Sequence, residues 1–227
     1  MNAKNIIQAT TVLLQICVLA NAQVVRQQRA SEDPESLRQM LANQPDYTAM
    51  QQFLFSEGFG GFGAKSKVAK MGGRQVEVTE DTIFIHEPGK PTIKVFPKRK
   101  EYSELPLEET DDFSVSPEGV AKRSDLVFKF LGTETVGRYQ CIKIEASYKD
   151  EKLKAMKFVF WVAPQLKNLV IKSETSLGER VKFVTLLEDV ALSVNEKLFR
   201  IPRGYKKVIE PDYMKRLEDS IRKPADP

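Results

Sequence analysis

Residues 154–163 read Lys-Ala-Met-Lys-Phe-Val-Phe-Trp-Val-Ala, and this stretch decides the fold class. Side chains at alternate positions point to opposite faces of a β-strand. One face of this stretch carries Met156, Phe158, Phe160 and Val162. The other face carries Lys157, Val159 and Trp161. The alternation predicts a strand with one strongly apolar face, and therefore a sheet that buries that face.

The flanking sequence repeats the pattern through the second half of the chain. The strand-like runs are Leu126–Leu131, Arg138–Tyr148, Lys154–Ala163, Asn168–Thr175 and Arg180–Leu187. Short polar or glycine-containing turns separate them, such as Asp150-Glu151 and Leu177-Gly178. Consecutive strands joined by short turns form an antiparallel meander.

The first half predicts two hairpins. Gly72-Gly73 joins one pair of strands, because glycine accepts the positive φ of a two-residue turn, and residues 87–91 join the other. The strands of these hairpins are predicted at Ala64–Met71, Arg74–Thr79, Thr82–His86 and Thr92–Phe96.

Helices are predicted near both ends of the chain. Asp33-Pro34 supplies an N-cap and a first-turn proline, and Asn43-Gln44-Pro45 ends that helix. A second helix is predicted over residues 211–222. The acidic segment 105–123 is predicted as a long loop or a short helical excursion. The fold class is therefore mainly β (α+β), with a sheet that is antiparallel throughout.

The apolar faces of these strands are rich in phenylalanine. A curved sheet would gather the rings on its concave side, where they would line an apolar ligand site or pack against the helices as core. The candidate ligand-binding residues are Phe128, Phe130, Phe158, Phe160 and Phe183.

The first 22 residues have the pattern of a secretory signal. An apolar run over residues 6–20 precedes Ala20-Asn21-Ala22, the small-residue pattern of a cleavage site. A membrane anchor is one alternative, but the run is shorter than the roughly 20 residues of a spanning helix. A lipid anchor at Cys17 is the other. Cleavage would leave residues 23–227 as a single periplasmic domain with no integral membrane span.

Composition and motifs argue against several functions. The formal net charge of +4 is too small for the basic footprint of a nucleic-acid-binding protein. Residues 58–63 match a dinucleotide-binding glycine pattern, but the following sequence predicts a hairpin and not a helix. His86 is the only histidine, so neither a metal cluster nor a histidine-based triad is expected, and no cofactor is predicted. Cys141 is predicted to be a structural thiol, and the basic run 98–100 a solvated strand end.

Several segments resemble a family of proteins. Lys94–Tyr102 resembles a P-x-x-K-x-Y strand, Leu131–Cys141 a G-x-E-x-v-x-G-y-x-C turn, and Phe160–Ala163 a strand that precedes a P-x-K bend. Leu198–Val208 resembles an F-x-(I/V)-P-x-G-Y ending. Together they resemble a bacterial family of unknown function related to the periplasmic outer-membrane lipoprotein carriers (LolA-like and LolB-like proteins).

The resemblance implies an incomplete antiparallel β-barrel over about residues 46–208, with helices packed as a lid on its concave side. In the carriers, the cavity between lid and sheet holds acyl chains. The function expected from this resemblance is non-enzymatic binding of lipid or of lipoprotein acyl chains. An envelope sensor or protein-interaction module with an envelope protein as partner is the alternative. A hydrolase is a third interpretation, but no catalytic constellation supports it.

The signal sequence gives a first testable prediction. Intact-mass measurement of exported protein should show a chain that begins at Gln23, because Ala20-Asn21-Ala22 is the A-x-A pattern at the end of the apolar run. A mass that includes diacylglycerol on Cys17 would contradict cleavage at this site and establish a lipid anchor.

Overall fold

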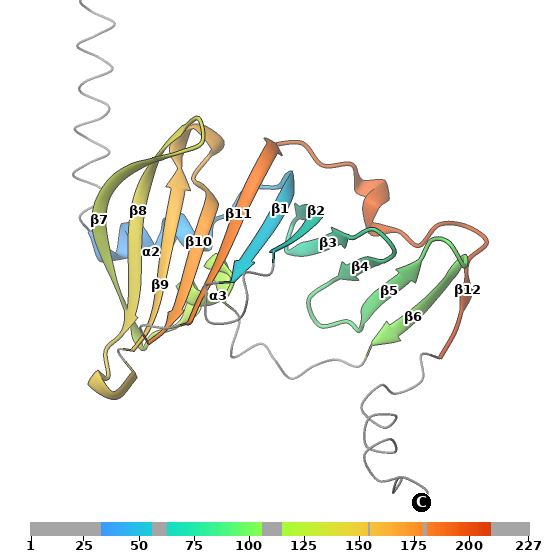
Figure 1. Ribbon diagram of the computed structural model, residues 1–227, viewed down its shortest axis with the longest axis horizontal. Coiled ribbons are helices and arrows are strands. Elements are labelled where there is room, and N and C mark those ends of the chain that lie inside the picture. The colour runs from blue at the N-terminus through green and yellow to red at the C-terminus, as the bar shows by residue number, and fades with distance from the viewer. Residues whose placement is uncertain (1–32, 56–62, 106–114, 154, 179–180, 210–227) are drawn as a thin grey trace, which may run out of the picture. The chain divides into compact units, whose positions relative to one another are not determined.

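The computed structural model describes residues 33–55, 63–105, 115–153, 155–178 and 181–209 (Figure 1). The elements of its first half are α2 (Pro34–Ala42), β1 (Tyr47–Phe55), β2 (Gly63–Met71), β3 (Arg74–Val78), β4 (Ile83–His86), β5 (Thr92–Phe96), β6 (Glu101–Leu105) and α3 (Pro117–Lys122). Those of its second half are β7 (Leu126–Val136), β8 (Tyr139–Tyr148), η3 (Glu151–Leu153), β9 (Met156–Ala163), η4 (Pro164–Leu166), β10 (Leu169–Leu177), β11 (Val181–Ala191), η5 (Glu196–Phe199) and β12 (Lys206–Lys207).

The strands are hydrogen-bonded in the order β12-β6-β5-β4-β3-β2-β1-β11-β10-β9-β8-β7. This order leaves β12 and β7 as the ends of the sheet, so the sheet does not close on itself. The predicted fold class is confirmed: mainly β, a curved and incomplete antiparallel barrel, with helices on its concave side. One detail is wrong, because β12 pairs with β6 in parallel. The two residues of β12 are both exposed lysines, so they carry no apolar alternation from which a strand could be predicted.

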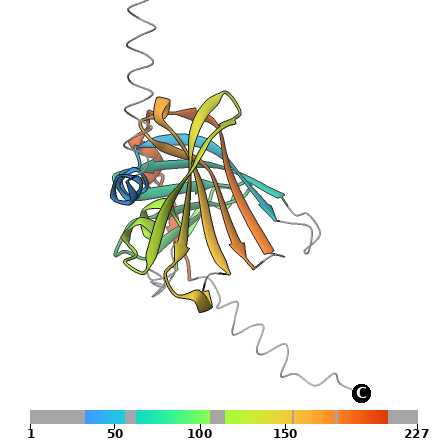
Figure 2. The same cartoon turned by 90° about the vertical axis from the view of Figure 1, so that its left-hand side faces the viewer.

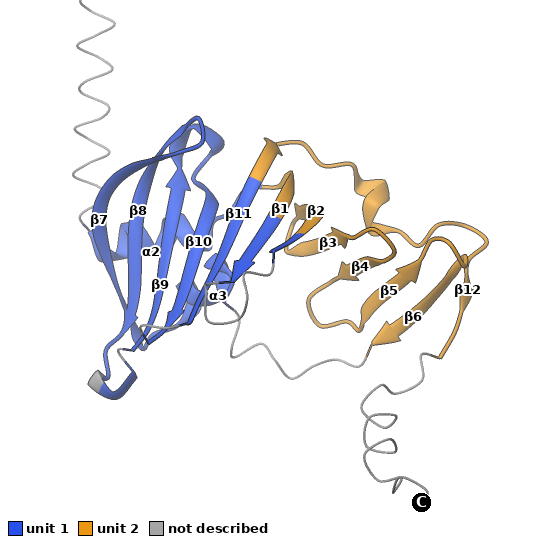
Figure 3. Cartoon of the chain, viewed as in Figure 1, with its two compact units in different colours: residues 1–45, 52–64, 110–187 blue, residues 46–51, 65–109, 188–227 orange. Residues whose placement is uncertain are grey.

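The described residues form two compact units, which Figure 3 distinguishes by colour. Unit 1 comprises residues 1–45, 52–64 and 110–187, and unit 2 comprises residues 46–51, 65–109 and 188–227. Unit 1 contains both α-helices and the strands with the phenylalanine-rich faces. The expectation of a single domain over residues 23–227 stays a prediction.

In unit 1, helix α2 forms where the sequence predicts it. The Asp33 carboxylate accepts hydrogen bonds from the Glu35 and Ser36 backbone N–H groups, and Pro34 occupies the first position of the helix. Leu37 and Leu41, one turn apart on the same side, are completely buried. Figure 2 shows the helix nearly end-on, beside the curved strands of its unit.

Unit 2 is a run of short antiparallel strands. Gly72 and Gly73 have φ values of 54° and 83°, and Met71 pairs with Arg74 across them, which confirms the predicted two-residue turn. One sheet face packs as a core under Phe199, the last residue of η5. The buried strand residues of this core are Ala69, Val76, Ile85 and Val95.

The structure adds strands that the sequence pattern did not predict as strands. The segment around Phe53–Phe55 is the end of β1, a nine-residue strand, and β6 ends at Leu105, the first residue of the predicted acidic loop. The short helix predicted as an alternative within this acidic segment is present and is α3. β-Bulges interrupt the pairing between Phe130 and Gly132 and between Val170 and Lys172. The second bulge shifts the alternation by one residue, so Lys172 pairs with Trp161 on the opposite face, although unbroken alternation would place Lys172 on the face of Val170.

Other predictions fall on residues that the structure does not describe. These are the signal sequence 1–22 with Cys17, residues 58–62 of the glycine-rich motif, and the helix predicted at 211–222. Gly63, the last residue of that motif, begins strand β2, as the hairpin interpretation requires. In the part of the chain that the structure describes, no helix has the length and apolarity that crossing a membrane requires.

The anchoring of α2 gives a stability prediction. Arg38 Nη1 donates hydrogen bonds of 2.8 Å to the carbonyl oxygens of Ala121 and Arg123. Arg38→Met keeps the apolar stem but removes these charge-assisted bonds, so the free energy of unfolding should fall by about 2 to 3 kcal/mol. Urea denaturation followed by the fluorescence of Trp161 measures it. Gln39→Ala, on the exposed side of the same helix, is the control, and equal stability of the two variants would contradict the prediction.

Candidate functional site

The candidate site is the concave face of the unit 1 sheet, and helix α2 is fixed across part of it. From the middle of the helix, Arg38 bonds the backbone that leads from α3 into β7, and its guanidinium carbon lies 4.6 Å from the ring centre of Phe128. Just beyond its C-terminal end, Gln44 Nε2 donates to the carbonyl oxygen of Asn168, and Gln44 Oε1 accepts from the N–H of Val170 at 2.8 Å. The helix is therefore tied to strands on both sides of β9.

The strand register brings all five predicted phenylalanines to this one face. Residues that pair directly across antiparallel strands have side chains on the same side of the sheet. One row of paired residues is Phe128, Ala146, Phe158, Thr175 and Phe183. The next row is Phe130, Ile144, Phe160, Ser173 and Thr185. We call these the first and second concave rows.

The five phenylalanines differ in their exposure. Phe158 and Phe160 are each 1% exposed and Phe128 is 5% exposed. These three belong to one apolar cluster with residues of both helices, and Phe130 packs against that cluster with partial burial. Phe183, at the β11 end of the first row, is 37% exposed. The face is thus a packed core at β7–β9 and is open at β10–β11.

The open part of the face includes residues that the sequence reasoning missed. Phe55, the last residue of β1, is 36% exposed and meets Phe183 edge to face with ring centres 5.2 Å apart. Leu177, at the end of β10, is 47% exposed and pairs with Met156 and Val181. Sequence alternation could have placed Leu177 on this face, but it could not show which strands the helices leave uncovered. We call Phe55, Phe183 and Leu177 the apolar strip.

The opposite face of the unit 1 sheet carries a compact charged cluster around the single tryptophan. Lys143 and Lys172 pair directly with Trp161, and their ammonium nitrogens lie 4.8 and 4.0 Å from its ring centre. Lys143 Nζ also donates to Glu134 Oε2 at 2.9 Å, and this bond lowers the pKa of the Glu134 carboxyl. The Trp161 indole Nε1 is buried and forms no hydrogen bond of ordinary geometry with the described residues. The bond from Lys143 is therefore the main cause of the lowered pKa of Glu134.

The remaining sequence candidates lie away from any reactive arrangement. Cys141 is a free, fully buried thiol, and burial raises its pKa, which fits the predicted structural role. His86 is exposed, and its Nδ1 lies 3.2 Å from Thr92 Oγ1. Among the residues that the structure describes, no group of histidine, cysteine, aspartate or glutamate side chains is placed to hold a metal ion.

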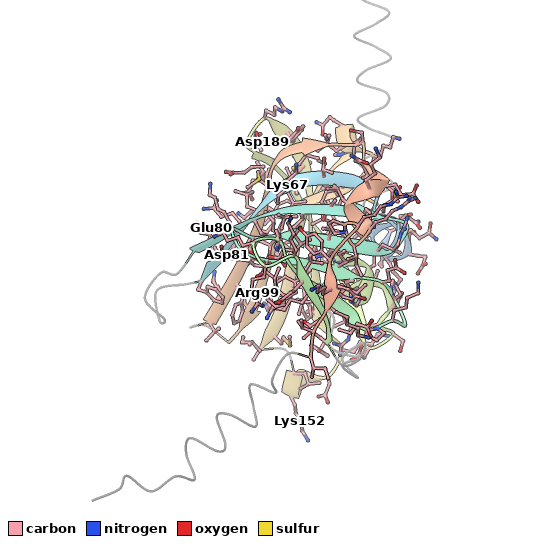
Figure 4. The ribbon with its side chains drawn as sticks, turned by 90° about the vertical axis from the view of Figure 1, so that its right-hand side faces the viewer. Lys67, Glu80, Asp81, Arg99, Lys152 and Asp189 are labelled. Carbon is pink, nitrogen blue, oxygen red and sulfur yellow. The ribbon has the colours of Figure 1, made fainter. Side chains whose placement is uncertain are left out.

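In unit 2, the basic run 98–100 is the end of a hairpin at the surface. Lys98 forms an ion pair with Asp81, and Arg99 pairs with Glu101 at 3.3 Å. Figure 4 shows Arg99 and Asp81 on this unit. Because carboxylates partly neutralise the run, it is the solvated strand end that the sequence predicts.

These features define a class of protein: a curved antiparallel sheet whose concave, phenylalanine-rich face is partly covered by helices. Residues 35–172 match the family described as Domain of unknown function (DUF4412), and the chain belongs to that family. No curated protein sequence matches the chain.

Several solved structures are similar to the chain at low sequence identity. A LolA superfamily protein from Nitrosomonas europaea is 13% identical, covers 74% of this chain and 97% of its own, and has a TM-score of 0.36. The lipoprotein LppX from Mycobacterium tuberculosis is 12% identical, with 65% and 88% covered and a TM-score of 0.39. The MucA/MucB complex from Pseudomonas aeruginosa is 12% identical, with 71% and 57% covered and a TM-score of 0.41.

The resemblance predicted from the sequence motifs is thus confirmed: the family is one of unknown function, and the structural neighbours include lipoprotein-carrier-like proteins. At these TM-scores, the neighbours carry no argument about what this chain binds.

The Glu134–Lys143 pair gives a pH prediction. Because the pKa of Glu134 is lower in the folded state, its stabilising effect is present above the carboxyl's ordinary pKa of 4.5 and is lost as the pH falls through the lowered value. Glu134→Gln should therefore reduce the thermal midpoint at pH 7, by an amount equivalent to about 1 kcal/mol or less for a half-exposed pair. The difference from wild type should shrink at acid pH.

Thermal unfolding at a series of pH values, followed by Trp161 fluorescence, measures this difference. Glu80→Gln, at an exposed turn residue labelled in Figure 4, is the matched control. A deficit of Glu134→Gln that stays the same at every pH would contradict the role of the carboxylate.

Proposed function

We propose that the protein is a non-enzymatic binding protein that takes an acyl chain on the concave face of unit 1. The observation that carries the proposal is the apolar strip. Phe183 is continuous, through the first concave row, with Phe158 and Phe128 of the buried cluster. An acyl chain laid on the strip would extend the core of the unit outward over β10 and β11.

The energetics of the strip support this proposal. Phe55, Phe183 and Leu177 are each more than one third exposed, and the two rings hold each other in an edge-to-face contact. Exposed apolar side chains that adjoin a core, and are not scattered singly, are typical of binding sites. Burying a methylene group contributes about 0.8 kcal/mol, so a chain of about ten carbons gains enough to offset the cost of association.

The chemistry of the two concave rows supports binding over catalysis. Every side chain in these rows is neutral, and none has an acidic or basic group in its ordinary titration range. Acid–base and nucleophilic catalysis need such groups within reach of a substrate. We therefore propose a carrier or a lipid-binding protein, located in the periplasm by the signal sequence expected at residues 1–22.

A second candidate function is recognition of an envelope protein through strand β7. This strand is an end of the sheet in the described structure, and on its convex face Val127 and Leu131 are 46% and 41% exposed. An unpaired strand edge can accept a strand from another chain. The bulge and Gly132 within β7 limit the length that such a strand could pair.

Two phenylalanine variants test the acyl-binding proposal. Phe160→Ala should reduce the free energy of unfolding by about 3 to 5 kcal/mol, because the ring is fully packed. Phe183→Ala should cost much less stability and should weaken binding of a fluorescent C18 polyene fatty acid several-fold. Titration with the probe, followed both by its emission and by energy transfer from Trp161, measures binding, and urea denaturation measures stability.

Val127→Ala, on the convex face, is the matched control and should bind the probe like wild type. If wild type binds neither the fatty-acid probe nor its neutral methyl ester, the acyl-binding proposal is wrong. Retention of a protein partner that Val127→Ala and Leu131→Ala release would then support the interaction module.

A further inference from the structure

Three hydroxyl groups interrupt the apolar concave face where it is open. Ser173 and Thr185 pair directly across β10 and β11 in the second concave row. Thr175 lies two residues from Ser173 on the same strand and face, and its cross-strand partners are Phe158 and Phe183. Paired residues have Cβ atoms about 5 Å apart, and residues i and i+2 of a strand are about 6.6 Å apart. The three hydroxyls therefore form one polar patch beside the apolar strip.

The patch has no hydrogen-bond partner within the described part of the chain. All three residues are half-buried, and none of their hydroxyl groups is bonded to another described residue. By contrast, the nearby Ser176 points to the opposite face, where its Oγ lies 3.4 Å from Glu174 Oε1. The hydroxyls of the patch thus depend on solvent or on a ligand for their hydrogen bonds.

A ligand on the strip would remove this solvent. A hydroxyl that is buried without a partner costs more free energy than a satisfied one gains, so an occupant made only of hydrocarbon would be penalised over the patch. A hydroxyl has one O–H donor, and a carbonyl oxygen accepts through two lone pairs. An acyl group whose carbonyl lies over Ser173, Thr175 and Thr185 would accept hydrogen bonds from two of the three donors that its own chain dehydrates.

The charges around this face disfavour a free carboxylate at the same place. The concave rows are neutral, and, among the residues that the structure describes, the two arginines that contact the face are at its β7–β8 end. Arg38 is bonded to backbone carbonyls, and Arg123 is paired with Asp125 at 3.1 Å while it lies over the Tyr148 ring. A buried charge without a counter-ion is strongly penalised, whereas a neutral carbonyl is not.

We propose that the concave face of unit 1 selects neutral acyl carbonyl compounds, namely acyl esters or acyl amides, over free fatty acids and plain hydrocarbons. The chain lies over Phe183, Phe55 and Leu177, and the carbonyl accepts hydrogen bonds from the patch of Ser173, Thr175 and Thr185. This inference rests on the proposed acyl-binding function and adds the class of ligand to it.

Competition against the fluorescent fatty-acid probe tests the selectivity. The competitors share a C12 chain: methyl dodecanoate, N-methyldodecanamide, dodecanoate, and tridecane as the hydrocarbon. In wild type, the ester or the amide should bind more tightly than dodecanoate and tridecane, and the tighter of the two identifies the linkage that the site prefers. Ser173→Ala/Thr185→Val should weaken the ester and the amide by about two- to tenfold for each hydroxyl removed, and should leave tridecane unchanged or tighter.

The single variants Ser173→Ala, Thr185→Val and Thr175→Val keep the side-chain volume nearly constant, so they provide the same readout if the double variant folds poorly. Ser176→Ala removes a hydroxyl from the opposite face of the same strand and is the matched control. Equal weakening of tridecane and ester, or no change in any variant, would overturn the assignment of the hydroxyl patch while acyl binding itself stands. Failure of wild type to bind the probe and all four compounds would instead overturn the proposed function, and this inference with it.

Discussion

The architecture of unit 1 depends on how a nine-residue helix is held against a sheet. A helix of this length is not stable alone in water, so α2 exists because of what it packs on. Leu37 and Leu41 bury one side of it. Arg38 at its middle and Gln44 just beyond its C-terminal end tie it to backbone atoms of the chain around β7 and β10. The position of this helix decides which part of the concave face is core.

The same constraint divides the phenylalanine-rich face by function. Under the helices, Phe158 and Phe160 have the burial of ordinary core residues, and a ligand would have to displace packed atoms to reach them. Beyond the helices, Phe183 and Phe55 continue the apolar face, but both side chains are exposed. A binding role is therefore proposed for the strip and not for the full set of rings.

Polar groups inside an apolar face give such a site its selectivity. Apolar area supplies affinity without direction, whereas a hydroxyl that loses water must find a hydrogen-bond partner. In unit 1, the hydroxyl groups that would need such a partner are those of Ser173, Thr175 and Thr185. On the convex face, Lys143 and Lys172 lie over the Trp161 ring and Lys143 is bonded to Glu134, so that cluster fits a structural role.

Local sequence determined much of this protein. Alternation placed Phe158 and Phe160 on one face, Gly72-Gly73 fixed a turn, and Asp33-Pro34 started a helix, because each depends on residues close together in the chain. Only the tertiary structure decided what is buried and what is open. The exposure of Phe183, its contact with Phe55 and the parallel pairing of β12 all depend on segments distant in sequence. Side-chain periodicity predicts the face of a strand on which a residue lies, but whether that face is buried depends on segments distant in the sequence.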